Sequence, residues 1–391
     1  RCRANNHDRN CNCNRYIGDR MSTLNVNAID KESGSTLTLG GSGTTLNVSN
    51  MVPDVALSNR NLIINGAMNV AQRGTQTGQG GSNVYSAVDR WEFVTNSAAR
   101  VTTSQDTSGL GNFSNTLKID CTTADTSIAV SDQAGIRTKL ESQDLQHLLW
   151  GTASAKTLTL RFTVSSPKAG IHCVQAHNRD AGYSYVQEFT VTSANTAEEF
   201  TVTIPGDTSN GFANDNGAEL EICFPLYNGT NWQTTSGSWQ SGNFFSTSNQ
   251  QNLLDDVANN FYLTGVQLEV GEVATPFEHE SFGNTVAKCQ RYYQKSYNLD
   301  IPPQTNLGGG RHYFYLSPNT TSGNKGSTVS FAVTMRASPS ITIYRQSDGA
   351  SGVFSNGVTA NVITVGQRSF MAYGTTTGVD FYAHWVADAE L

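Results

Sequence analysis

The chain has 391 residues, more than one ordinary domain holds, so its length predicts two or three domains. Charged residues make up 15% of it and Gly contributes 36 positions, which excludes a typical disordered or helical composition and favours an all-β chain with many turns. The net charge of −7 argues against nucleic acid as a partner, because phosphate binding needs a basic stripe. No apolar run of about 18 residues occurs, so we expect no membrane insertion.

Residues 1–20 differ in composition from everything that follows. They hold five Arg against two Asp, and three of the seven Cys. A basic start can open a signal peptide, but no apolar run follows here. We therefore expect residues 1–20 to be a disordered leader, either an upstream stretch read in error or a cloning remnant, with the native chain beginning at Met21.

The cysteines do not fit a metal site or a disulfide framework. Cys2, Cys11 and Cys13, close to His7, have the spacing Cys-x8-Cys-x-Cys, which lacks the Cys-x2-Cys pairs of zinc sites. We predict no metal and no cofactor, and Ca²⁺ has no support because no clustered Asp motif occurs. The remaining cysteines lie in apolar patterns and are expected to be isolated buried thiols: Cys121, Cys173, Cys223 and Cys289.

Residues 21–57 have the pattern of a stalk made of very short strands. Apolar residues alternate in pairs such as Leu24 with Val26 and Leu37 with Leu39, separated by Gly and Ser turns. So few residues cannot bury a core alone, because small units need neighbours. Pairing the same strands from several chains around an axis would bury these faces, so we expect a homotrimer. A flexible leader is the alternative.

Residues 58–282 are expected to form one β-sandwich. Gly, Asn, Asp and Pro separate most of its apolar runs, as turn residues do. A short amphipathic helix is expected around 142–149, where Leu145 and Leu148 are three residues apart. The candidate strands are 62–70, 90–95, 115–121, 127–131, 157–164, 170–177, 184–191, 198–204, 218–226 and 261–270.

The last candidate strand leads into the second half of the chain. Alternate residues from Tyr262 to Leu268 predict one common face. Pro276 cannot donate a ladder hydrogen bond and should end the sheet edge. The apolar spacing then lengthens, so a linking helix is expected over 283–297, followed by a C-terminal β-sandwich over 298–391.

No catalytic constellation emerges from the sequence. The loose Gly-x-Ser-x-Gly match around Ser238 has the wrong spacing and no strand-to-helix elbow. The carboxylate pairs Asp255/Asp256 and Glu278/Glu280 are expected to be solvated loop charge. We therefore predict that the protein is not an enzyme.

Aromatic residues in polar loops are the better functional lead. Sugars present apolar C–H faces beside hydroxyl groups, so their sites combine flat rings with amide, carboxylate or guanidinium groups. We predict glycan contacts at Tyr344, Arg368 and Tyr373, with Trp232 and Trp239 as a rival site. The alternative is that such rings fill a core or a trimer interface.

Three segments carry a resemblance to a known family. The segments are TGVQLEVG-x-VATPFE followed by CQRYY (264–293), NLIINGAMNVAQRG followed by DRW (61–91), and FYAHWVADAEL (381–391). The first resembles the seam between a jelly-roll module and a C-terminal module in bacteriophage tail-fibre and related virion proteins. The second is similar to the opening of that jelly roll, and the third to the usual chain ending. Residues 22–49 are similar to N-terminal repeats of fibre proteins from marine cyanobacterial phages.

The resemblance implies a jelly roll like those of carbohydrate-binding modules, in a protein located on the virion of a tailed phage. It implies contact with other virion proteins through the stalk and binding of a host-surface glycan, which we expect at residues 298–391. One alternative is a capsid-decorating or tail-structural protein without host contact. A third is a polysaccharide depolymerase, which commonly needs a long parallel β-helix, and this chain lacks the repeats for one.

Overall fold

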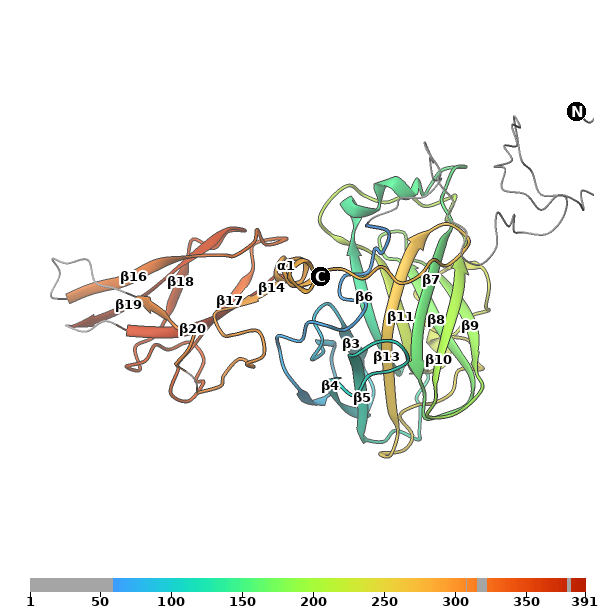
Figure 1. The fold of residues 1–391 in the computed structure, drawn as a ribbon, viewed down its shortest axis with the longest axis horizontal. Coiled ribbons are helices and arrows are strands. Elements are labelled where there is room, and N and C mark those ends of the chain that lie inside the picture. Colours follow the sequence, from blue (N-terminus) through green and yellow to red (C-terminus); the bar gives the residue numbers. More distant parts are fainter. Residues whose placement is uncertain (1–58, 307, 315–321, 378–380) are drawn as a thin grey trace, which may run out of the picture. The chain divides into compact units, whose positions relative to one another are not determined.

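The strands between residues 59 and 282 pair into two antiparallel sheets that share one core (Figure 1). The structure is a computed structural model that describes residues 59–306, 308–314, 322–377 and 381–391. The expected leader (1–20) and stalk (21–57) lie outside the described residues. The described residues belong to one compact unit, so the boundaries expected at 282/283 and 297/298 stay predictions.

Each sheet of the sandwich is antiparallel throughout. The first has the order β1 (Gln76–Gln79), β4 (Arg100–Asp106), β5 (Thr116–Thr123), β13 (Asn260–Val270), β7 (Leu158–Ser165), β10 (Ala197–Ile204). The second has the order β12 (Trp239–Ser241), β9 (Tyr183–Val191), β8 (Gly170–Asn178), β11 (Ala218–Asn228), β6 (Gln133–Glu141), β3 (Glu92–Thr95), β2 (Val84–Tyr85). The predicted all-β class and β-sandwich are confirmed.

Alternation of apolar and polar residues explains why these segments are strands. In β7, Leu160 and Phe162 are fully buried, and in β11 the same holds for Ile222 and Phe224. Residues two apart on a strand share a face, so each strand presents one apolar row to the core. Burying each such side chain contributes about 1.5–3 kcal/mol, which makes this shared core the main source of stability.

Two predicted strands are wrong. The segment 62–70 turns instead, because Asn65 and Met68 have positive φ values of 61° and 58°, which a strand does not allow. The segment 127–131 is a loop, because the side chains of Asp125 and Asp132 accept hydrogen bonds from nearby backbone N–H groups and compete with a ladder. Five strands of the sandwich were not predicted: β1, β2, β4, β6 and β12.

Strand β13 does not keep the predicted common face. Its pairing with β7 shifts register between Thr264 and Gln267, and Gly265 there has φ of +62°. Such a bulge reverses the alternation. Leu263 before it and Val266 after it are therefore both fully buried, although one lies at an odd and the other at an even position.

The helices are shorter than expected. A 3₁₀ helix, η1 (Ser142–Leu148), packs the buried Leu145 and Leu148 on the sandwich, as predicted, and a second short one is η2 (Thr230–Trp232). The linking helix α1 (Phe282–Gln290) starts at the Ser281 cap and stops well before Tyr297. The chain then extends into β14 (Tyr293–Lys295), because pairing with the C-terminal strand outweighs the helical spacing.

The C-terminal part contains two small antiparallel sheets around a second core. In one, β14, β15 (His312–Phe314) and β17 (Ser340–Tyr344) all pair with β20 (Phe381–Asp388). In the other, β16 (Ser322–Ser330) and β18 (Asn361–Ile363) pair with β19 (Ser369–Thr377). The core contains the fully buried rings of Phe314, Phe354, Phe370 and Phe381. The expected second β-sandwich is therefore present.

A buried cluster of charges joins the last residues of the chain to the first sandwich. The Glu390 carboxylate, only 3% exposed, is paired with the guanidinium groups of Arg73 (3.2 Å) and Arg90. Arg90 lies over the ring of Tyr292 at 3.5 Å, and Arg73 over that of Tyr293 at 3.8 Å. Arg73 also lies 3.4 Å from Asp388 and 3.8 Å from Asp89, whereas Glu390 is the one carboxylate paired with Arg90 among the described residues. We name this group the Glu390 cluster.

Replacing Glu390 with Ala should lower the free energy of unfolding by about 3–5 kcal/mol, because it leaves the buried Arg90 without its carboxylate partner. Chemical denaturation of the variant and the unchanged chain measures this difference. Glu272→Ala is the matched control, since Glu272 is exposed. A loss below about 1 kcal/mol for Glu390→Ala would contradict the assigned role of the cluster.

The buried His177 predicts loss of stability in acid. Its Nδ1 lies 3.1 Å from the Tyr183 carbonyl oxygen and 3.0 Å from the Ser184 hydroxyl, and burial lowers the pKa of the imidazole below its usual value. Below about pH 6.5 the unfolded chain gains a proton that the folded chain does not, so folding weakens as the pH falls.

We expect His177→Gln to lose less stability than the unchanged chain between pH 7.5 and pH 5.5. The difference should not exceed about 1.4 kcal/mol for each pH unit below 6.5. Urea unfolding at both pH values provides the measurement, with the exposed His147→Gln as control. An identical pH dependence of His177→Gln and the unchanged chain would contradict the prediction.

Candidate binding sites

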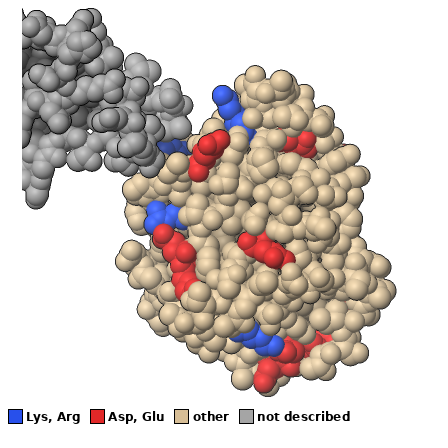
Figure 2. Space-filling view, turned by 90° about the vertical axis from the view of Figure 1, so that its right-hand side faces the viewer, with Lys and Arg blue, Asp and Glu red and all other residues tan. Residues whose placement is uncertain are grey.

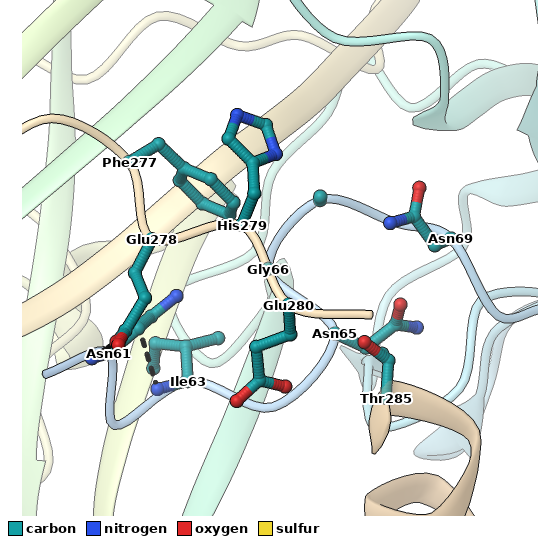
Figure 3. Close-up of a pocket in the computed structure, with 11 residues that line it drawn as sticks. Asn61, Ile63, Asn65, Gly66, Asn69, Phe277, Glu278, His279, Glu280 and Thr285 are labelled. Atoms are coloured by element: carbon teal, nitrogen blue, oxygen red, sulfur yellow. Dashed lines mark hydrogen bonds between the residues drawn. The ribbon is translucent and has the colours of Figure 1, made fainter. Parts of the chain in front are cut away.

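A small pocket lies where the turns after residue 60 meet the segment that follows β13 (Figure 3). Its volume of about 30 Å³ admits a group of the size of one or two water molecules. We name it the motif pocket, and its lining residues are Asn61, Ile63, Asn65, Gly66, Ala67, Asn69, Phe277, Glu278, His279, Glu280 and Thr285.

Asn61 fixes the walls of the motif pocket against β13. Its side chain accepts hydrogen bonds from the backbone N–H groups of Ile63 and Leu268, both at 3.0 Å, and donates to the Val266 carbonyl at 3.1 Å. Gly66 then lies directly on the strand, because a Cβ there would come within 2.0 Å of the Val266 oxygen. Glycine is required at this close approach.

Two rings, Phe277 and His279, form one rim of the motif pocket, and a third ring packs against both. Phe277 contacts Phe113 edge-on at 4.9 Å between centroids, and His279 contacts Phe277 at 4.9 Å. Phe113 reaches this place across Gly265, where a Cβ would lie 2.4 Å from the ring. His279 is exposed and both Phe rings are half-buried, so the rim presents aromatic surface to solvent.

Polar side chains occupy the rest of the motif pocket. The Asn69 oxygen accepts from Asn115, which leaves the Asn69 amide N–H groups available. Glu278 accepts from the Asn61 backbone N–H at 2.9 Å with one oxygen, and Glu280 is ion-paired with Lys288. These carboxylates were expected to be solvated loop charge, but both are half-buried in the lining. The pocket thus combines aromatic surface, a donor and acceptors.

The predicted contacts of the C-terminal part do not form one site. Arg368 is exposed just before β19 and lines a groove of about 260 Å³. Tyr373 lies five residues further along, which is about 17 Å on an extended strand, and on the face opposite to the buried Ala372. Tyr344 is on β17 of the other sheet. We name the groove the Arg368 groove, and its lining residues are Ser330, Phe331, Ala332, Val333, Thr334, Arg368 and Ser369.

The two tryptophans of the rival site lie apart and are engaged in packing. Trp232 stands edge-on to Phe245 at 5.7 Å, and its indole N–H donates to the Ser131 carbonyl. Trp239 stands edge-on to Trp150 at 5.2 Å, and its N–H donates to the Pro205 carbonyl. Both are half-buried. Their role as glycan contacts, like that of Tyr344, Arg368 and Tyr373, stays a prediction.

A charge network on the outer face of the second sheet was missed from the sequence. Arg137 bonds Glu92 at 2.6 Å and Glu221 at 3.0 Å, and Lys139 and Arg179 add further pairs at 2.8 Å and 2.7 Å. Burial opposes ionisation of Glu92, yet its two cationic neighbours lower the pKa of the carboxyl. The sequence pattern that could have predicted this network is the alternation of charged and apolar residues in β6 and β11. Every one of these charges is paired with an opposite one, three cations with two carboxylates, so we assign them to structure.

The described part of the chain contains neither a cluster of potential metal ligands nor a helix that could span a membrane. No group of three or more His, Cys, Asp or Glu able to hold a metal occurs among the described residues. Within the same residues no helix is long and apolar enough to cross a membrane.

The four cysteines expected to be buried thiols are buried and free, whereas the Cys2, Cys11, Cys13 and His7 positions lie outside the described residues. On the face shown in Figure 2, Lys and Arg lie singly among Asp and Glu.

Comparison with known proteins gives structural likenesses of low similarity. No family model matches the chain, and no curated protein matches it. A family 11 carbohydrate-binding module from Clostridium thermocellum, solved with a β-1,3-1,4-mixed-linked tetrasaccharide, has 16% identity and a TM-score of 0.26, over 52% of this chain and 98% of that one. TmCBM61, solved with β-1,4-galactotriose, has 10% identity and a TM-score of 0.27, over 55% of this chain and 100% of that one.

The enzymatically active domain of tailspike protein 4 from bacteriophage CBA120 has 9% identity and a TM-score of 0.26, over 54% of this chain. The match spans only 21% of that domain. Similarities at these TM-scores and identities carry no argument about ligand or activity. The assignment of the fold rests on the strand pairing described above.

Proposed function

We propose that the chain is a virion fibre protein of a tailed phage that attaches to a host-surface glycan without catalysing its cleavage. The observation that carries the proposal is the motif pocket with its aromatic rim. The resemblance of its two lining segments to phage fibre proteins supports the location on the virion.

The motif pocket has the chemistry that a sugar needs. The C–H face of a sugar ring packs on aromatic surface, here Phe277 and His279, against which Phe113 packs. Hydroxyl groups need donors and acceptors together, which Asn69 and the two carboxylates offer. A volume of about 30 Å³ excludes a whole ring but admits a hydroxymethyl arm. The sugar therefore lies on the rim with one arm inserted.

Such a contact is weak for one chain, and the proposed trimer compensates for this. Linking identical sites turns later binding events into intramolecular ones, so avidity rises without new contacts. The stalk over 21–57 holds the three chains together in this proposal and contacts other virion proteins.

Phe277→Ala should weaken binding of the purified protein to host cells by about threefold to tenfold, the range that corresponds to about 0.5–1.5 kcal/mol for an aromatic contact. Asn69→Ala should weaken it as well, because the pocket loses its amide donor. Binding of fluorescently labelled protein to whole host cells provides the measurement. Val273→Ala is the control, because this residue is 77% exposed and outside the pocket.

Three outcomes would contradict the proposal at different points. Equal binding by Phe277→Ala and Val273→Ala would remove the motif pocket as the site. Release of shortened glycan by the purified protein would show an enzyme. Antibodies that label capsid faces on intact virions, in a protein that does not bind host cells, would favour the decorating role.

A further inference from the structure

Arg368 differs from the other arginines of the described chain. Every other described arginine donates to at least one acceptor, as Arg345 does to Asp348 at 2.8 Å and Arg311 to Gln346 at 3.1 Å. The guanidinium group of Arg368 has no hydrogen-bond or ion-pair partner in the described part. Its donors are therefore available to a ligand.

The Arg368 groove brings this guanidinium together with hydroxyl groups. Two backbone hydrogen bonds hold its walls: Phe331 N–H to the Arg368 carbonyl at 2.9 Å, and Met335 N–H to the Gln367 carbonyl at 2.7 Å. The hydroxyl side chains among its lining residues belong to Ser330, Thr334 and Ser369.

The surroundings leave the charge of Arg368 uncompensated. No Asp or Glu is among the lining residues of the groove. The ring of Phe331 lies 5.8 Å from Phe370 and 5.9 Å from Trp385, so it packs into the core and leaves a polar wall. The groove thus presents one positive charge and several hydroxyl donors within about 260 Å³.

We infer that the Arg368 groove binds an acidic sugar residue, through a carboxylate or a sulfate ester. A guanidinium group is a planar fork whose two N–H groups match the oxygens of such anions, and these charge-assisted bonds are strong. Hydroxyl groups rotate to donate to the remaining oxygens. The volume is just under that of pockets for drug-sized ligands, so it fits about one monosaccharide.

Charge distinguishes this site from the motif pocket. The motif pocket contains Glu278 and Glu280, whose carboxylates repel an anion, whereas no carboxylate lines the Arg368 groove. The net charge of −7 gives no long-range attraction for a polyanion, so a preference for acidic glycan must come from local contact with Arg368. The inference rests on the proposed glycan binding and assigns the charge of the glycan.

The test compares charged polymers with their neutral counterparts, using the full chain. The probes are immobilised alginate against carboxyl-reduced alginate, and dextran sulfate against dextran. We expect the charged member of at least one pair to bind about tenfold more tightly, and the pair that shows this identifies carboxylate or sulfate. Arg368→Gln should abolish the preference, while Arg368→Lys should keep part of it, because an ammonium group retains the charge without the fork.

Arg345→Gln is the matched control, an arginine of the same C-terminal part that is already paired with Asp348. It should retain the full preference. An Arg368→Gln variant that binds as the unchanged chain does would overturn the inference, and so would the absence of any preference in the unchanged chain. Host-cell binding that is lost in Phe277→Ala but kept in Arg368→Gln would leave the proposed function standing while the inference failed.

Discussion

The buried charges around Glu390 constrain the rest of the structure. Two arginines from the opening of the first sandwich, Arg73 and Arg90, share one carboxylate that comes from the far end of the sequence. Isolated buried cations are costly, and Arg90 would become one without Glu390, whereas Arg73 would keep Asp89 and Asp388 nearby. Arg90 even adopts a positive φ of 75° there, a strain that the surrounding contacts must offset. Removing the C-terminal part would therefore test folding as well as recognition.

Patterns within single strands were enough to predict much of the fold. The segments around Leu160 and Ile222 alternate so regularly that strand and core position follow together. The errors arose where a side-chain hydrogen bond or pairing with a distant strand determines the local backbone conformation. Asn65 bonds the backbone of a turn, and Tyr293 joins β20 instead of continuing a helix. Neither the partner strand nor the bulge at Gly265 is visible in local spacing.

The candidate sites depend even more on contacts that the sequence does not show. Composition led to the prediction that Arg368 contacts a glycan, and the structure adds that its guanidinium group has no partner in the described part of the chain. Aromatic content alone favoured Trp232 and Trp239, whose N–H groups turn out to be bonded within the sandwich. The rim of Phe113 and Phe277 was missed because their contact joins positions 164 residues apart in the sequence.

The bulge at Gly265 sets a rule for how this sequence can change. Before the bulge the odd-numbered residues of β13 face the core, and after it the even-numbered ones do. Conservative substitutions within each half keep this arrangement, whereas an insertion or deletion between the halves shifts the second half to the wrong face. Deleting one residue there would leave the composition and mean hydropathy almost unchanged while turning Val266 and Leu268 to the other face, where the buried polar side chains of Gln267 and Glu269 now lie. It would also remove the space that Phe113 occupies. Relatives of this chain should therefore vary in the loops at either end of β13 and keep its length fixed.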